Sequence, residues 1–164
     1  MNRRKFIATT SLGATYLFLN ATALVKSMTN SNNMKELRLI LTVDNLDEVI
    51  DFYKNKVGLK ESLSWNEKTG RGIILEAGKS SLELIDRNHK DFIDNMEVGE
   101  AGVSGDVRIA LNFGESLPEK SNFLLENGAK KIGNLTKAPW SNVMRMEDPS
   151  GMQITLFDTS TVTE

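Results

Sequence analysis

The segments 37–60 and 107–130 share one pattern of apolar and polar positions. Each begins with a run in which successive side chains alternate between two faces, then shows apolar residues spaced three and four apart, and ends at a glycine. A period of two indicates a β-strand, and a period of three to four indicates an amphipathic helix. The pattern therefore predicts strand, turn, helix and glycine stop, twice in one chain.

The ends of both predicted helices carry suitable residues. In the first, Asn45 precedes Glu48 by three residues, as in a capping box, and Gly58 suits the left-handed position after the last turn. In the second, Pro118 falls in the first turn and Gly128 follows the last. The apolar positions predicted to be buried are Leu46, Val49, Ile50, Tyr53 and Val57 in the first helix and Leu117, Leu124 and Leu125 in the second.

Each predicted helix is followed by three strand-like runs, so each half is a βαβββ unit. These runs are 61–66, 71–77 and 80–86 in the first half and 130–134, 141–147 and 152–158 in the second. The predicted fold class is α+β, with two βαβββ units in one chain forming a curled mixed sheet around a cleft and one main helix per unit outside. We expect one domain over residues 34–160, with unit one at 35–95 and unit two at 105–158. His89 is expected in a loop, and the glycine-containing stretch 95–105 in a linker.

The amino-acid composition excludes several kinds of catalytic and metal-binding site. The 164 residues contain no cysteine and one histidine, so thiolate metal sites, disulfides, a cysteine nucleophile and any site with two histidine ligands are excluded. Four of the 20 basic side chains and none of the 22 acidic ones fall in residues 1–33. The remainder is therefore acidic and has no basic stripe, which argues against a nucleic-acid partner.

Residues 1–33 look like a targeting segment and polar linker. Arg3 and Arg4 begin a run similar to the twin-arginine export signal of bacteria, and an Ala-Thr-Ala cleavage-type site ends at Ala23. The apolar stretch between them is too interrupted to predict a stable membrane span. We expect export to the periplasm; the alternative is a cytoplasmic protein translated from Met28 or Met34.

Four stretches together resemble the vicinal-oxygen-chelate superfamily of glyoxalases, bleomycin-resistance proteins and dioxygenases. The resemblance covers about residues 35–158. It is carried by Val43-Asp44-Asn45-Leu46, by Asp51-Phe52-Tyr53 with Val57-Gly58-Leu59, by Ala138-Pro139-Trp140, and by Asp148-Pro149-Ser150-Gly151. The resemblance implies a small-molecule ligand and a homodimer.

Metal-using members of this superfamily place a ligand in the first and last strand of each unit. Carried over, those positions are Arg38, Glu83, Arg108 and Thr155. Arginine offers only donors and stays protonated, so this set predicts no metal and no cofactor. Instead, two guanidiniums and one carboxylate leave about one net positive charge. Either they bind an anionic or carboxylate-bearing ligand, or Glu83 neutralises the arginines in a structural ion pair.

Two tryptophans are further candidates. Trp140, in a loop that enters a strand, is either a ligand wall or core, whereas Trp65 is expected to be core at a sheet edge. In the strand at 141–147, the sequence does not show which set of side chains faces the cleft.

The leading functional hypothesis is a metal-independent small-molecule-binding protein similar to the bleomycin-resistance branch, with ligand contacts from Arg38, Glu83, Arg108, Trp140 and Thr155. The first alternative is an enzyme, a lyase or isomerase of the glyoxalase-like type, with Glu83 as general base. The second is a metal enzyme, including a dioxygenase, with ligands from other positions.

Overall fold

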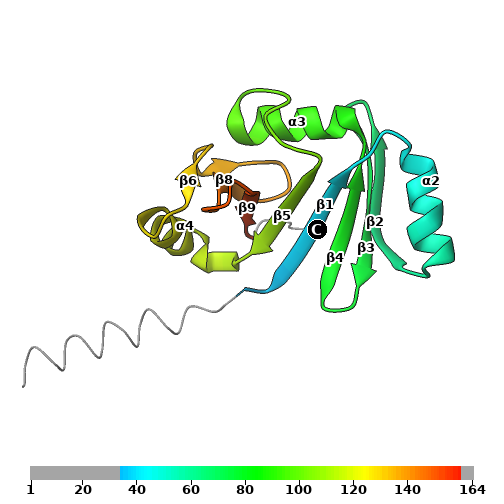
Figure 1. The fold of residues 1–164 in the computed structure, drawn as a ribbon, viewed down its shortest axis with the longest axis horizontal. Coiled ribbons are helices and arrows are strands. Elements are labelled where there is room, and N and C mark those ends of the chain that lie inside the picture. Colours follow the sequence, from blue (N-terminus) through cyan, green and yellow to red (C-terminus); the bar gives the residue numbers. More distant parts are fainter. Residues whose placement is uncertain (1–33, 160–164) are drawn as a thin grey trace, which may run out of the picture. The chain divides into compact units, whose positions relative to one another are not determined.

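The computed structural model describes residues 34–159, which form one mixed nine-stranded sheet (Figure 1). The strand order is β2-β3-β4-β1-β5-β9-β8-β6, and β7 pairs with β8. The predicted targeting segment lies outside the described residues. Within them, no helix is both long and apolar enough to cross a bilayer.

The chain contains the two predicted βαβββ units, the second with one additional two-residue strand, β7, which pairs with β8. The first comprises β1 (Glu36–Thr42), α2 (Leu46–Ile50) with its π-helical continuation (Asp51–Lys56), β2 (Lys60–Glu67), β3 (Gly70–Ala77) and β4 (Ser80–Ile85). The second comprises β5 (Val107–Asn112), a 3-10 turn (Gly114–Ser116), α4 (Leu117–Glu126), β6 (Lys130–Lys131), β7 (Thr136–Lys137), β8 (Asn142–Glu147) and β9 (Gln153–Phe157). The predicted fold class is confirmed.

The two units join at the centre of the sheet. Strands β1 and β5 pair antiparallel, and each also pairs in parallel with the last strand of its own unit, β4 or β9. First and last strands of both units thus lie side by side at the centre. The four positions derived from the family resemblance lie on these strands.

Helices α2 and α4 cover the outer face of the sheet (Figure 1). Leu46 of α2 packs in one apolar cluster with side chains of β3 and β4, and Leu117 of α4 packs in another with side chains of β8 and β9. Two details of the first helix were wrong. Val57 is 51% exposed, and the Asn45 side chain donates to the Glu48 carboxylate instead of capping the backbone.

A third helix, α3 (Arg87–Val98), replaces the loop predicted around His89 and the first part of the predicted linker. Asp86 caps it by accepting a hydrogen bond from the His89 N–H at 2.8 Å, and Gly99 ends it in the left-handed conformation. Its buried positions recur at helical spacing, but three of the four are charged: Lys90, Ile93, Asp94 and Glu97. A search for apolar periodicity therefore misses this helix.

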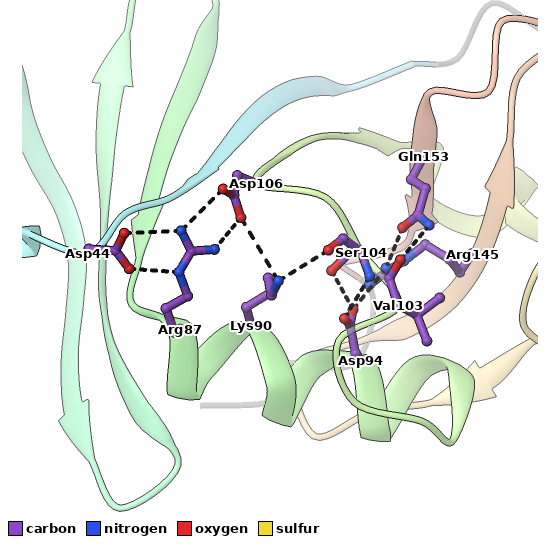
Figure 2. Close-up of polar contacts among 9 residues, drawn as sticks. All are labelled: Asp44, Arg87, Lys90, Asp94, Val103, Ser104, Asp106, Arg145 and Gln153. Atoms are coloured by element: carbon purple, nitrogen blue, oxygen red, sulfur yellow. Dashed lines mark hydrogen bonds and ion pairs between the residues drawn. The ribbon is translucent and has the colours of Figure 1, made fainter.

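Ion pairs attach the start of α3 to both units (Figure 2). Arg87 pairs with Asp44, just before α2, and with Asp106, just before β5. Further along, Lys90 donates to the Ser104 carbonyl oxygen at 3.2 Å. The Asp94 carboxylate accepts from both the N–H and the hydroxyl of Ser104. Hydrogen bonds and ion pairs therefore hold the segment between α3 and β5 against the helix.

Two glycines let neighbouring groups approach the sheet closely. A Cβ at Gly70 would lie 2.3 Å from the His89 backbone nitrogen, and one at Gly72 would lie 2.2 Å from Cζ2 of Trp65. Both distances are shorter than real contacts, so any larger side chain forces α3 or Trp65 to move.

We predict that Gly70→Ala lowers the free energy of unfolding by roughly 2–4 kcal/mol, because the clash with α3 adds to the strain of a positive φ. Gly78→Ala is the matched control, since Gly78 also has a positive φ but no atom near its Cβ position. Urea denaturation of both variants measures the difference. Equal losses in the two variants would contradict the close approach.

Candidate functional site

A cavity of about 550 Å³ lies on the concave face of the sheet and is here called the central cavity. The sheet, α3 and the loop before β8 line it. The structure brings together in its lining all five residues singled out from the sequence: Arg38, Glu83, Arg108, Trp140 and Thr155. Its size is in the range of sites that hold small molecules.

Strand register explains why these side chains meet. Ile40 of β1 pairs with Glu83 on one side and with Arg108 on the other. Ala110 of β5 pairs with Arg38 on one side and with Thr155 on the other. Since directly paired residues share a face, these two rows put both arginines, Glu83 and Thr155 on the concave surface.

Arg38 is the more fully paired of the two arginines. Its guanidinium donates to Glu83 Oε2 at 3.0 Å, to Glu36 Oε1 at 3.0 Å and to the Ser81 hydroxyl at 3.2 Å. It also lies 5.3 Å from the centre of the Phe157 ring. These contacts hold Arg38 in a structural ion-pair cluster, one of the two interpretations left open by the sequence.

Arg108, by contrast, lacks hydrogen-bond partners for part of its guanidinium. Its side chain is 1% exposed, and among residues 34–159 the one carboxylate within ion-pair distance is that of Glu97, with Nη1 and Oε2 3.8 Å apart. Its Nε and Nη2 are buried and have no hydrogen-bond partner among residues 34–159. Burial, together with the nearby Arg145 cation, lowers the pKa of Arg108 from its ordinary value. An oxygen acceptor from a ligand would relieve this deficit.

Arg145 explains why Glu97 does not satisfy Arg108. Arg145 donates to Glu97 Oε2 through Nε at 2.9 Å and also through Nη2. Its Nη1 donates to Asp94 at 3.1 Å. Arg145 itself is completely buried. A buried charge is costly without partners, and Arg145 forms both short hydrogen bonds to the Glu97 carboxylate, which lies between the two arginines.

The charges around the cavity differ from the sequence-based expectation. Two arginines and one carboxylate were expected to leave about one net positive charge. Glu97, from the helix that was not predicted, and Glu67 also line the cavity, so two arginines and three carboxylates leave about one net negative charge. Net charge therefore does not favour an anion, and the groups that could donate to one are the unpartnered Nε–H and Nη2–H of Arg108.

The side chains at the four family positions do not fit a divalent metal. Arg38 and Arg108 present donors, and Thr155 Oγ1 lies 3.4 Å from Glu97 Oε2, toward which it donates. Glu83 is the one carboxylate of the set, and Arg38 holds its Oε2. In the part of the chain that the structure describes, no three His, Asp or Glu side chains are grouped to hold an ion. We therefore derive no step through a metal.

Aromatic groups also line the central cavity. Trp65 packs against the core cluster as predicted, but it also lines the cavity, together with His89 and Trp140. Burial lowers the pKa of His89 despite the opposing effect of Glu83, so its imidazole is neutral near pH 7.

Sequence reasoning missed three residues of the site and its support: His89, Glu97 and Arg145. Strand parity is now settled, because Val143 lines the cavity while Met144 and Met146 pack in the cluster beneath α4. Arg145 shares the parity of Val143 and so points to the concave side. The helical spacing of Lys90, Asp94 and Glu97 could have indicated the buried face of α3. It was overlooked because these residues are charged and the search was for apolar positions.

We predict that Ser104→Ala shifts acid unfolding to higher pH. Burial raises the pKa of Asp94, but the two hydrogen bonds from Ser104 and the charge of Arg145 outweigh it, so the pKa is lowered overall. A lowered folded-state pKa stabilises the fold above about pH 4 and loses that contribution as the pH falls. Losing the hydroxyl removes roughly 1–3 kcal/mol at neutral pH.

Circular dichroism against pH measures the shift, and Ser150→Ala is the control. Ser150 bonds Asp148 in an exposed turn in a similar way, through both its N–H and its hydroxyl. A Ser104→Ala protein with an unchanged acid midpoint would show that this cluster contributes nothing to acid stability.

Comparison with known proteins places the fold in a family. Residues 36–156 match the model of the Glyoxalase/Bleomycin resistance protein/Dioxygenase superfamily. No curated protein matches the sequence.

Solved structures show the same fold at low sequence identity. A hypothetical protein from Bacillus halodurans is 19% identical with a TM-score of 0.57, covering 82% of this chain and 99% of its own. Methylmalonyl-CoA epimerase from Mycobacterium tuberculosis is 12% identical with a TM-score of 0.54, covering 79% and 89%. The Streptomyces coelicolor epimerase, in complex with 2-nitronate-propionyl-CoA, is 16% identical with a TM-score of 0.53, covering 80% and 97%.

At these identities the structural likeness concerns the fold alone, whereas the family match spans most of the chain. The paired βαβββ units, with first and last strands at the centre of one curled sheet, agree with that match. The chain belongs to the Glyoxalase/Bleomycin resistance protein/Dioxygenase superfamily.

Proposed function

We propose that this chain is a metal-independent small-molecule-binding protein whose ligand carries a carboxylate or similar anionic group. The observation that carries the proposal is Arg108, a buried guanidinium in the cavity wall with two N–H groups that no described residue satisfies. Buried donors are nearly always paired in native proteins. Both atoms are enclosed in this conformation, so a ligand oxygen would become their partner after a rotation of the guanidinium toward the cavity that it lines.

The geometry of a guanidinium suits such a ligand. Nε and Nη2 lie on one edge of the planar group, and a carboxylate can accept from both at once. Each unmet buried donor costs about 1–3 kcal/mol, and a charged contact is stronger at a buried group than in water. A carboxylate that accepts from both N–H groups would therefore be stabilised at this position.

Arg145 has a positioning role in this proposal. By donating twice to Glu97, it keeps that carboxylate from turning fully toward Arg108. Without Arg145, the nearest acceptor for Arg108 is Glu97, already 3.8 Å away. The chain's own carboxylate would then occupy the place proposed for the ligand.

An enzyme of the lyase or isomerase type is the second candidate, with Glu83 as general base. In support, Glu83 lines the cavity and lies across Ile40 from Arg108, a suitable arrangement for taking a proton from a molecule held by that arginine. Against it, Arg38 holds Glu83 Oε2 at 3.0 Å. Turnover that Glu83→Gln abolishes, with ligand binding retained, would favour the enzyme.

We predict that Arg108→Gln weakens carboxylate binding 10- to 100-fold, the loss expected for one charged, double hydrogen bond. The probes are 2-naphthoate, its saturated counterpart decalin-2-carboxylate, and their neutral amides, measured by titration calorimetry. Glu97 keeps its pair with Arg145 in this variant, so the fold should survive. Arg71→Gln is the control, because Arg71 forms an exposed pair with Asp47 and does not line the cavity. If both variants bind the acids as the unaltered protein does, the proposed site is wrong.

A second prediction concerns Arg145. Replacing it with Met should lower carboxylate affinity at least 10-fold, because Glu97 is freed to pair with Arg108. Adding Glu97→Gln to the same chain removes the competing negative charge and leaves only a weaker amide acceptor, so it should restore most of the affinity. A role in stability alone predicts no rescue, so a double variant that binds as poorly as Arg145→Met contradicts the positioning role. Thermal unfolding checks that both variants fold.

A further inference from the structure

We infer that the central cavity takes a planar aromatic carboxylic acid, an inference that rests on the proposed function and names its ligand class. The ring of this acid would lie against an aromatic wall formed by Trp65, His89, Phe92 and Trp140. All four side chains line the cavity. The acid group would meet Arg108.

The aromatic wall is continuous and comes from separate parts of the chain. Ring centroids are 4.9 Å apart between Trp65 and His89, 5.9 Å between His89 and Phe92, and 6.0 Å between Phe92 and Trp140. Trp65 belongs to β2, the next two belong to α3, and Trp140 precedes β8. All four side chains are partly exposed, so the wall retains free ring surface.

Apolar side chains of the sheet line another part of the central cavity. Ile40, Ala110, Val143 and Phe157 line the cavity from the sheet and belong to the same core cluster. Flat rings gain about 0.5–1.5 kcal/mol from stacked or edge-on contact beyond the burial of their area. A saturated ring of equal size buries similar area but gains none of this, so the wall discriminates by flatness and aromaticity.

The wall is fixed before a ligand arrives. Trp65 lies directly on Gly72, and α3 approaches Gly70 at His89, with no room for a Cβ at either glycine. A pre-formed surface saves the entropy of ordering side chains on binding.

The wall also carries unmet polar atoms. Trp65 Nε1 and His89 Nδ1 are buried without a hydrogen-bond partner in the region 34–159. Because both atoms are enclosed by protein and the wall is fixed, its preference for a ligand comes from the ring faces and not from these atoms.

Nuclear magnetic resonance of the full chain tests this inference. The protein has two tryptophans, and both line the cavity. Its two indole N–H signals therefore report on the wall without interference from other tryptophans. The probes are 2-naphthoate, decalin-2-carboxylate and 2-naphthamide. We expect 2-naphthoate to shift both signals and to bind at least 10-fold more tightly than either comparison compound.

Trp140→Leu should weaken 2-naphthoate binding 3- to 10-fold and leave decalin-2-carboxylate unchanged. Phe52→Leu is the control, since Phe52 is an aromatic residue that is 55% exposed and lies outside the cavity lining.

The outcomes separate this inference from the function on which it rests. Equal binding of the two acids, both weakened by Arg108→Gln, would overturn the aromatic preference and leave the carboxylate site intact. Failure of both acids to bind, or binding that ignores Arg108→Gln, would overturn both. Tight binding of 2-naphthamide equal to that of the acid would also overturn both.

Discussion

The competition of two buried arginines for one carboxylate is the interaction on which the proposed ligand site of the central cavity depends. Arg145 takes Glu97 through two hydrogen bonds, and Arg108 is left 3.8 Å from the same oxygen. Since buried ions are costly without partners, this unequal division makes Arg108 the position where an outside anion gains most. Net charge does not favour an anion, because three carboxylates and two arginines line the cavity.

Helix α3 carries the carboxylates that pair with Arg145. It supplies Asp94 and Glu97 to Arg145, and His89 and Phe92 to the aromatic wall, so one element builds the polar and the aromatic side of the cavity. Ion pairs of Arg87 fasten its first turn to both units (Figure 2). The connection between the two repeats therefore supplies part of the site.

The sequence was sufficient for the fold and for part of the site. Alternating strands, paired glycine stops and the repeat predicted both units. The family resemblance singled out Arg38, Glu83, Arg108 and Thr155, and strand register places all four on one face. Helix α3 was missed because its buried face is charged, and apolar periodicity is blind to such a face. Glu97 and Arg145 were missed for a related reason: which charges pair across a core depends on tertiary packing, and local spacing does not encode it.

A crystal structure of the chain with 2-naphthoate tests the central claim most directly. The account predicts a carboxylate that accepts hydrogen bonds from Nε and Nη2 of Arg108, while Glu97 remains on Arg145. A structure in which Glu97 has turned to Arg108, or in which the acid binds away from this arginine, would contradict it.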